Sequence, residues 1–393
     1  MNKLCYPADP TAPVLILDPP KNVEFDLAGQ GYTHTHYFVI LPSRNSPRWL
    51  LPLYDPCWSL MGAQIYTPYG PTARVVKGLL MWIIRAGWTR WARHRVLVAS
   101  REPLPIEVLV SEVTGERHPI FALSLGNQPA VRKLTVQVMS PDGDILGYMK
   151  LPLTDRAIER VRNEATVLEQ LWNFPALRPR VPRLLYAGNW NESYVLFQSS
   201  LEGEAGPVSF DGMHEQFLRT LWNVHRVEKP GQRLISEVAV KWEKAAPLLG
   251  GKWSELGQET LRCSSRNLNE KELQFGVMHG DFAPWNTRVQ QRELLSFDWE
   301  SADWEAPTSW DMFHFHVQTA SSFGKDNRHW LTFDAQSSNE ASFMLYLLSS
   351  VCQLLEEGNH EAISYRQKLL IRQLDQSRQK LGKVRLGNRA SAA

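Results

Sequence analysis

The segment FGVMHGDFAPWNTRV, at residues 275–289, constrains the fold more than any other stretch of the chain. Apolar residues lead into it and a valine leads out of it, so buried backbone is expected to present a polar loop. The loop carries His279, Gly280 and Asp281, and Asn286 follows Asp281 by five positions. A fold that contains this segment must bury both flanks and hold the polar groups at one loop end.

The composition is that of a large globular protein. The 393 residues, 43% hydrophobic and 21% charged, exceed the size at which a single core usually stops growing, so more than one domain or lobe is expected. The 43 Lys and Arg residues nearly balance 41 Asp and Glu residues and leave a net charge of +2. No overall field therefore favours nucleic acid as a partner.

The cysteines and the first residues favour a cytoplasmic protein. Cys5, Cys57, Cys263 and Cys352 lie far apart and form no CxxC pair, which argues against zinc and thioredoxin-type sites and fits a reduced compartment. The opening MNKLCYPADP contains no long apolar run, so we do not expect a signal peptide.

Residues 71–95 predict an amphipathic helix. Its apolar run, GLLMWII, is much shorter than the about 20 residues that span a bilayer, so no crossing is expected. The basic residues of one side are Arg74, Lys77 and Arg85, and the apolar residues of another are Val76, Leu79 and Ile83. We expect this helix to pack on its own protein with the basic residues outward, and weak contact with a membrane surface is the alternative.

Residues 1–115 form an N-terminal accessory region to which the sequence assigns no role. The region is rich in proline and aromatic residues and contains no recognisable chemical signature. Its THTH run places His34 and His36 on one face if the run is a strand. No third metal ligand stands near them, so we expect surface or packed histidines.

Residues 116–200 predict a β-rich lobe of three strands, one helix and two strands. FALSL and RKLTVQVM are rich in strand formers, and SPDGD supplies a turn before ILGYMKL, which carries Lys150 near its end. The helix DRAIERVRNEATVLEQLW then has apolar residues at helical spacing and Glu164 at its centre. The runs RLLYAG and SYVLFQ complete the lobe.

Residues 201–385 read as mostly helical and contain the polar loop, and residues 386–393 are expected to be a flexible tail. The strand pair TRVQQRELLSFDWE would return Asp298 to the neighbourhood of Asp281, seventeen positions earlier (298 minus 281). Two carboxylates and the Asn286 amide would then converge. Mg²⁺ prefers such oxygen ligands, and an aspartate aimed at a hydroxyl accepts its proton, so the set suits phosphoryl transfer from a nucleotide.

At this point the residues resemble the aminoglycoside phosphotransferase and choline kinase superfamily, which are small-molecule kinases with a protein-kinase-like fold. The family pattern is His-Gly-Asp, two variable residues, Pro, one variable residue and Asn. It is complete here as His279, Gly280, Asp281, Pro284 and Asn286. The resemblance implies that Asp281 is the catalytic base and that His279, Gly280 and Pro284 shape the loop.

The same resemblance assigns residues downstream of the loop. Asn286 and the Asp298 of FDWE would be the Mg²⁺ ligands. Asp311 in APTSWDMFHF would brace the catalytic loop from the start of a helix. The neighbouring His314 and His316 are expected to pack within that helix.

Upstream, the resemblance implies a nucleotide site. Lys150 would contact the α- and β-phosphates and Glu164 would pair with it, while Glu159 and Glu169 are alternatives to Glu164. The backbone at residues 198–201, from Gln198 to Leu201, would meet the adenine edge.

The expected nucleotide-covering loop departs from the protein-kinase pattern. It should lie in SLGNQPAVRKL, where Gly126 is the only glycine and GxGxxG is absent, so residues 124–128 are the weaker site candidates.

The resemblance covers residues 116–385 and implies an α+β, protein-kinase-like bilobal fold with a small β-rich N-lobe, a larger helical C-lobe and an extra N-terminal region. It implies an ATP- and Mg²⁺-dependent kinase that phosphorylates a hydroxyl of an aminoglycoside, sugar, choline-like or other amino alcohol. Acidic residues such as Glu202, Asp303 and Glu305 either line a pocket for a cationic acceptor or are solvated loop charges. A non-catalytic nucleotide-binding scaffold that acts through the N-terminal region is the alternative function.

Overall fold

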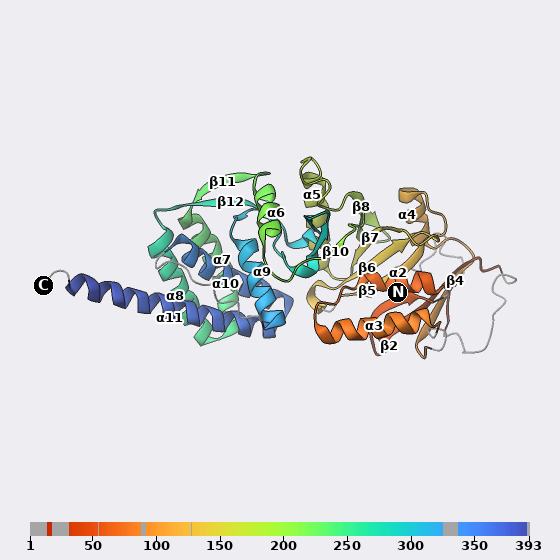
Figure 1. Ribbon diagram of the computed structural model, residues 1–393, viewed down its shortest axis with the longest axis horizontal. Coiled ribbons are helices and arrows are strands. Elements are labelled where there is room, and N and C mark those ends of the chain that lie inside the picture. Colours follow the sequence, from red (N-terminus) through yellow and green to blue (C-terminus); the bar gives the residue numbers. More distant parts are fainter. Residues whose placement is uncertain are drawn as a thin grey trace. The chain divides into compact units, whose positions relative to one another are not determined.

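A computed structural model describes residues 14–17, 31–53, 55–87, 92–126, 128–324 and 337–390 of the chain (Figure 1). The described structure is a mixed α/β protein with a β-sheet lobe in its N-terminal half and a helical C-terminal region. The chain divides into two compact units, residues 1–170 with 182–202, and residues 171–181 with 203–393.

The first unit is built on one antiparallel sheet. Its nine described strands follow the spatial order β1-β4-β2-β3-β5-β6-β7-β9-β8. The bounds are β1 Val14–Leu17, β2 His34–Ser43, β3 Ser46–Pro52, β4 Arg95–Ser100, β5 Ile120–Leu125, β6 Lys133–Met139, β7 Ile145–Pro152, β8 Leu184–Trp190 and β9 Ser193–Gln198. The Asp-Gly turn between β6 and β7 contains Gly143 at a φ of +97°, which a tight hairpin turn favours.

Alternate residues of each strand reach opposite faces of this sheet. Phe38 and Ile40 of β2 join a core covered by α4, at Pro105–Thr114, whereas Val39 between them joins the core on the other face. Helices α2, at Pro56–Gly62, and α3, at Pro71–Arg85, supply that second core. Helix α5, at Asp155–Leu171, connects β7 to the last two strands.

The boundary expected at residue 115 falls inside the first unit. Strand β3 precedes it and pairs with β5 beyond it, with Trp49 opposite Ser124 and Leu50 opposite Leu123. The strands on both sides of residue 115 are therefore parts of one sheet. The local strand pattern did not show this join because strand pairing is a long-range contact.

Helix α3 packs differently from the expectation. Ile84 is fully buried and Leu80 and Met81 pack beside it, so one side of the helix does cover the sheet. Val76 and Leu79, which we expected on the packed side, are 66% and 56% exposed. Helical periodicity identified an apolar side, but it could not decide which side would meet the sheet.

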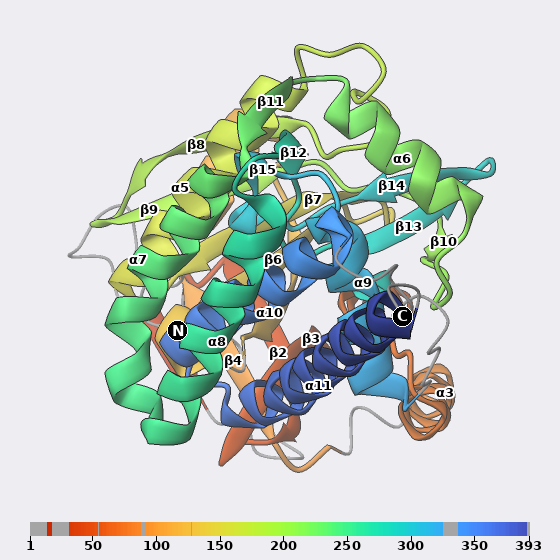
Figure 2. The same cartoon turned by 90° about the vertical axis from the view of Figure 1, so that its left-hand side faces the viewer.

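The second unit is mainly helical. Its helices are α6 Gly212–Trp222, α7 Gly231–Leu249, α8 Gly251–Leu268, α9 Trp310–Phe323, α10 Ser338–Glu357 and α11 His360–Ala390. Helix α10 is apolar on most sides and buried, and it packs against α7, α8 and α11 (Figure 2). Residues 386–390 continue α11, and residues 391–393 of the expected tail lie outside the described residues.

Two small sheets of the second unit carry the polar loop. One contains β10 Glu204–Ala205, β13 Thr287–Gln290 and β14 Glu293–Ser296, and the other contains β11 Arg226–Pro230, β12 Glu272–Met278 and β15 Asp303–Pro307. The chain passes from β12 through the loop into β13, so each end of the loop is fixed in a different sheet.

None of the described helices has the length and apolar character needed to cross a membrane. Cys57, Cys263 and Cys352 are free thiols, and Cys5 lies outside the described residues. The cytoplasmic setting stays a prediction.

Gly147 of β7 tests the packing of the large sheet. Its φ is +156°, and a Cβ added to it would lie 2.2 Å from the carbonyl oxygen of Gln198 in β9. We expect Gly147→Ala to lower the free energy of unfolding by about 2 kcal/mol or more, because the two strands must separate or strain. Urea unfolding followed by circular dichroism measures this loss.

Gly78 provides the matched control, because a Cβ added there meets nothing within 4 Å and the residue lies within α3. Gly78→Ala should stabilise the protein by up to about 1 kcal/mol. Equal unfolding midpoints for the two variants would contradict the close approach of β7 to β9.

Candidate active site

His279 anchors the start of the polar loop. The imidazole is fully buried, its Nε2 lies 3.1 Å from the Phe297 carbonyl oxygen, and its Nδ1 accepts from the Asp281 backbone N–H at 3.3 Å. This pattern fits a neutral ring with its proton on Nε2. Burial lowers the pKa of His279, which opposes the effect of the nearby Asp311 carboxyl.

Asp311 of α9 holds the backbone of the same loop. Its two carboxylate oxygens accept from the N–H groups of His279 at 2.8 Å and Gly280 at 3.0 Å. Gly280 has a φ of +80°, and a Cβ on it would lie 2.0 Å from the Ser301 carbonyl oxygen, so only glycine fits there. Burial raises the pKa of the Asp311 carboxyl, while the His279 ring and the two N–H donors oppose that rise.

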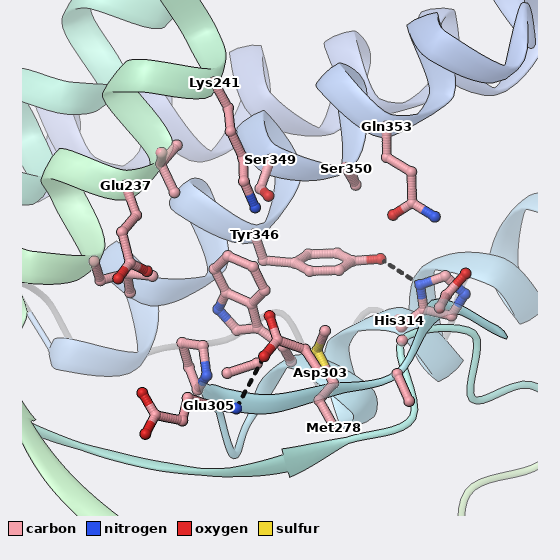
Figure 3. Close-up of a pocket in the computed structure, with 18 residues that line it drawn as sticks. Glu237, Lys241, Met278, Asp303, Glu305, His314, Tyr346, Ser349, Ser350 and Gln353 are labelled. Atoms are coloured by element: carbon pink, nitrogen blue, oxygen red, sulfur yellow. Dashed lines mark hydrogen bonds between the residues drawn. The ribbon is translucent and has the colours of Figure 1, made fainter. Parts of the chain in front are cut away.

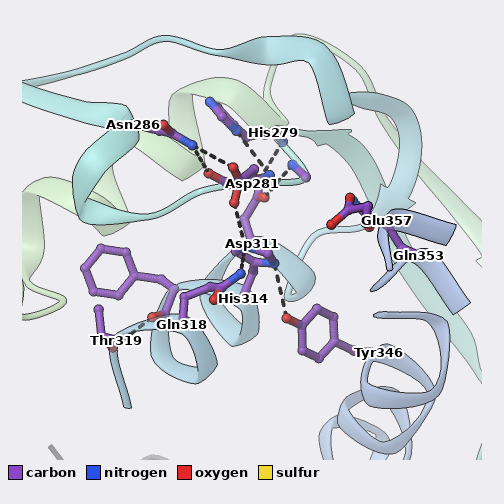
Figure 4. A network of polar contacts seen from close by, with 12 residues as sticks. His279, Asp281, Asn286, Asp311, His314, Gln318, Thr319, Tyr346, Gln353 and Glu357 are labelled. Carbon is purple, nitrogen blue, oxygen red and sulfur yellow. Dashed lines mark hydrogen bonds and ion pairs between the residues drawn. The ribbon is translucent and has the colours of Figure 1, made fainter. Parts of the chain in front are cut away.

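Asp281 and Asn286 face each other across the loop (Figure 4). The Asn286 side-chain NH₂ donates to the Asp281 carbonyl oxygen at 2.9 Å and to its carboxylate Oδ2 at 2.8 Å. Pro284 begins the short 3₁₀ turn that contains Asn286. Both hydrogen bonds are donated by the nitrogen of the Asn286 side-chain amide, so the amide oxygen points away from Asp281.

Asp298 lies beside this loop. The Asn286 carbonyl oxygen accepts from the Phe297 N–H at 3.0 Å, which ties the loop to the residue before Asp298. Asp298 adopts a left-handed backbone conformation with a φ of 70°, which is uncommon for a residue with a side chain. A carboxylate oxygen of Asp298 and one of Glu300 lie within 4.8 Å of each other, which is a spacing that one cation can bridge.

His314 is a site residue that the sequence interpretation missed. Its Nε2 lies 3.0 Å from Asp281 Oδ1, and its Nδ1 lies 3.2 Å from the Tyr346 hydroxyl (Figure 4). Burial raises the pKa of Tyr346 to about 12, so the phenol keeps its proton and can donate it to Nδ1. His314 then has its own proton on Nε2 and donates to Asp281.

The expectation that His314 only packs within its helix is therefore wrong. A usable signal was present, because His314 follows Asp311 by three positions (314 minus 311) and residues three apart share one side of a helix. His316, by contrast, contacts the Phe210 ring and not Asp281. Burial lowers the pKa of His316 to about 4.

A cavity of about 210 Å³ opens beside the loop (Figure 3). Gly280 of the loop and His314 of α9 line it, and Trp310 and Tyr346 provide aromatic walls. Lys241 of α7 points into the cavity. The remaining polar lining includes Glu237, Asp303, Glu305, Ser349, Ser350 and Gln353.

Most of the acidic lining is already neutralised. Glu305 pairs with Lys229 and lies 3.2 Å from Arg233, and Arg233 also pairs with Glu237 at 2.8 Å. Asp303 accepts a backbone hydrogen bond from Glu305 at 2.9 Å and has no ion pair with a described residue. Lys241 likewise has no ion pair with a described residue. The cavity is therefore lined by one carboxylate and one ammonium that are not in ion pairs among the described residues, those of Asp303 and Lys241. Glu202 belongs to the other compact unit.

The first unit contains the residues expected to contact a nucleotide. Lys150 alternates with the core residues Met149 and Leu151 in β7, so it points from the opposite face of the sheet. There its Nζ lies 2.6 Å from both carboxylate oxygens of Glu164 in α5, and both side chains are buried. The alternatives Glu159 and Glu169 are exposed.

The other expected nucleotide-site residues lie at strand ends. Gly126 follows β5, and its N–H donates to the Lys133 carbonyl oxygen at 3.0 Å. Gln198 ends β9 and is buried, and its side-chain oxygen has no hydrogen-bond partner among the described residues. Leu201 is half-buried in the connection that follows. Residue 127 lies outside the described residues.

Residues 134–309 match the profile of the phosphotransferase enzyme family. No curated protein sequence matches the chain. Among solved structures, a variant of a thermostable mutant of aminoglycoside phosphotransferase APH(4)-Ia, in a ternary complex with AMP-PNP and hygromycin B, matches with a TM-score of 0.50 at 12% identity. The match covers 70% of this chain and 98% of that chain.

Two further solved structures cover a similar part of the chain. Choline kinase LicA from Streptococcus pneumoniae matches with a TM-score of 0.47 at 13% identity, over 69% of this chain and 98% of that chain. The GDP complex of wild-type aminoglycoside 2'-phosphotransferase-IIIa matches with a TM-score of 0.45 at 12% identity, also over 69% and 98%. Residues 134–309 therefore resemble the phosphotransferase enzyme family, which agrees with the resemblance that the loop motif indicates.

Proposed function

We propose that the chain is an ATP- and Mg²⁺-dependent phosphotransferase that transfers the γ-phosphate to a hydroxyl of a small molecule. The observation that carries this proposal is the setting of Asp281. Its side chain is 35% exposed, and His314 and Asn286 hold one carboxylate oxygen each. It is adjacent in sequence to Gly280, which lines a cavity. A carboxylate that is fixed and still accessible suits a base acting on an acceptor hydroxyl.

Asp281 would orient the acceptor and receive its proton. The acceptor hydroxyl donates a hydrogen bond to the carboxylate, and its oxygen bonds to the γ-phosphorus as the bond to the β-phosphate oxygen breaks. The hydroxyl proton passes to Asp281. His314 and Asn286 would fix the angle of the carboxylate, while His279, Gly280, Pro284 and Asp311 would hold the loop.

The donor set fits Mg²⁺. The Asn286 amide donates through nitrogen, which leaves its oxygen side for a cation, and Asp298 and Glu300 add carboxylate oxygens. We propose Asn286 and Asp298 as the ligands. When bound, Mg²⁺ would neutralise charge on the phosphates.

The nucleotide would bind residues of the sheet unit. Lys150, held by Glu164, would contact the α- and β-phosphates, and the backbone from Gln198 to Leu201 would meet the adenine edge. Gly126 would belong to the loop that covers the nucleotide. The buried Lys150 and Glu164 pair supports this assignment, because the Glu164 carboxylate fixes the direction of the lysine side chain.

The charges around the cavity favour an acceptor of low net charge. Glu305 and Glu237 are satisfied by Lys229 and Arg233, and Asp303 offsets Lys241. A polycationic aminoglycoside needs several carboxylates without partners. A sugar or a zwitterionic alcohol fits this lining better, since the other lining residues include hydroxyl, amide and aromatic side chains beside aliphatic ones.

Replacing the base should stop turnover. We expect Asp281→Asn to reduce kcat by about 10² to 10⁴ while ATP affinity stays within a few-fold, because the amide accepts no proton but fits the same space. ADP release from Mg-ATP in the presence of pooled sugars, hydroxy amino acids, amino alcohols and aminoglycosides measures turnover. Unchanged turnover in the variant would remove Asp281 from the mechanism.

The control for this experiment is Asp375→Asn, which alters an exposed carboxylate that pairs only with Arg378 among the described residues. It should behave like the unmodified protein.

Testing the acceptors of the pool one by one should show faster ADP release with sugars or hydroxy amino acids than with kanamycin. ATP binding without ADP release from any acceptor would favour the alternative function, a nucleotide-binding scaffold.

His314 should act as a positioning residue. We expect Tyr346→Phe and His314→Gln each to lower kcat by about tenfold, with little change in KM for ATP. The first variant removes the hydroxyl that holds His314, and the second removes the imidazole that donates to Asp281. Neither residue is proposed to contact the nucleotide. The control is His316→Gln, whose ring lies in the same helix but does not contact Asp281. Equal kcat for the His314 and His316 variants would show that the contact with Asp281 is not used.

A further inference from the structure

Helix α3 exposes an unusually large apolar surface for a helix that already packs on a sheet. The exposed fractions of its outer apolar residues are 71% for Val75, 66% for Val76, 56% for Leu79 and 53% for Trp82. These four residues are called the α3 patch. Residues 75, 79 and 82 follow the i, i+4, i+7 spacing of one helix side. A surface helix normally carries polar residues on that side, so the α3 patch indicates an interaction surface.

The charges of α3 all have one sign. Arg74, Lys77 and Arg85 are its ionisable residues, and residues 71–85 contain no Asp or Glu. Arg74 and Arg85 lie eleven positions apart (85 minus 74), close to three full turns, so they share one flank of the α3 patch. Both are exposed, whereas the Lys77 ammonium donates to the Tyr66 carbonyl oxygen at 2.5 Å.

An apolar cavity adjoins the helix. It has a volume of about 280 Å³ and an almost wholly apolar lining that includes Trp49, Tyr66, Val76 and Leu80. Tyr66 is itself 39% exposed and its ring packs against Trp49 at 5.0 Å between centroids. Apolar surface therefore continues from the α3 patch inward between the helix and the sheet.

We infer that α3 is an interfacial helix that binds the surface of an anionic lipid bilayer. The α3 patch is an apolar stripe that includes a tryptophan, and the helix has arginines beside the stripe and no acidic residue. At the boundary between lipid headgroups and acyl chains, apolar side chains insert and basic groups contact lipid phosphates. The cavity beside Val76 gives inserted acyl groups further apolar contact. The inference uses residues of the first unit only and does not depend on the phosphotransfer proposal.

Charge argues against a second copy of the chain as the occupant. Two α3 patches placed face to face would bring the arginine flanks of two helices together without an acidic residue from either helix to balance them. An anionic surface satisfies the same arginines. Each basic residue near such a surface strengthens binding by about fivefold.

Sedimentation of the full chain with vesicles tests the inference. One vesicle preparation is phosphatidylcholine alone and the other is an equimolar mixture of phosphatidylcholine and phosphatidylserine. We expect binding to the mixed vesicles to be at least about tenfold stronger and to weaken as salt is raised. Binding to neither preparation, or equal binding to both, would overturn the inference.

Matched variants locate the surface. The double substitution Leu79→Gln with Trp82→Gln should reduce binding to the mixed vesicles by at least about tenfold, and Arg74→Gln with Arg85→Gln should do the same. The controls are Val240→Gln with Leu248→Gln, at residues 55% and 74% exposed, and Lys244→Gln with Lys252→Gln, at exposed lysines. Equal losses in the control pairs would overturn the assignment to α3.

Light scattering after gel filtration distinguishes the competing occupant. A monomer before and after the α3 substitutions agrees with a lipid surface. A dimer that the Leu79 and Trp82 substitutions dissociate would overturn the inference, because the α3 patch would then be an interface between two copies.

Discussion

The candidate catalytic loop depends on the buried carboxylate of Asp311. It accepts hydrogen bonds from two consecutive N–H groups, those of His279 and Gly280, at the point where Gly280 turns into a left-handed conformation. Without that acceptor, the buried His279 N–H would lack a partner at a cost of about 1 to 3 kcal/mol, and the part-buried Gly280 N–H would lose its partner as well. Helix α9 is not part of the loop, but its Asp311 side chain holds the loop backbone directly before Asp281. This contact helps to orient Asp281.

The same helix also reaches the reactive group itself. Asp311 and His314 lie one turn apart on α9, so one side of the helix supports the loop backbone and the Asp281 carboxylate together. Tyr346 of α10 extends the support into the helical core, because its buried phenol holds the His314 ring. The proposed base is therefore fixed by rigid helices, an arrangement that keeps a catalytic group in productive geometry.

The two units present different surfaces to their surroundings. The cavity of the helical unit is polar and nearly charge-balanced, as expected for a small acceptor. The first unit carries the apolar α3 patch with arginines beside it. Because β3 pairs with β5, α3 rests on the same sheet that contains Lys150. The N-terminal region is thus an integral part of the sheet unit, and an interaction surface on it would belong to the body that carries the proposed nucleotide residues.

The local helices and strands and the candidate residues of the polar loop could be predicted from the amino-acid sequence. Residues 279–286 are consecutive in the chain, and the strand, turn and helix signals around Lys150 and Glu164 are equally local, so pattern and spacing predicted these elements. The roles of the residues came from the family resemblance. Other features depend on the tertiary structure. Buried Glu164, and not exposed Glu159, pairs with Lys150, His314 contacts Asp281, and the α3 patch is exposed. Each of these outcomes depends on contacts between residues distant in sequence, which helical or strand periodicity does not specify.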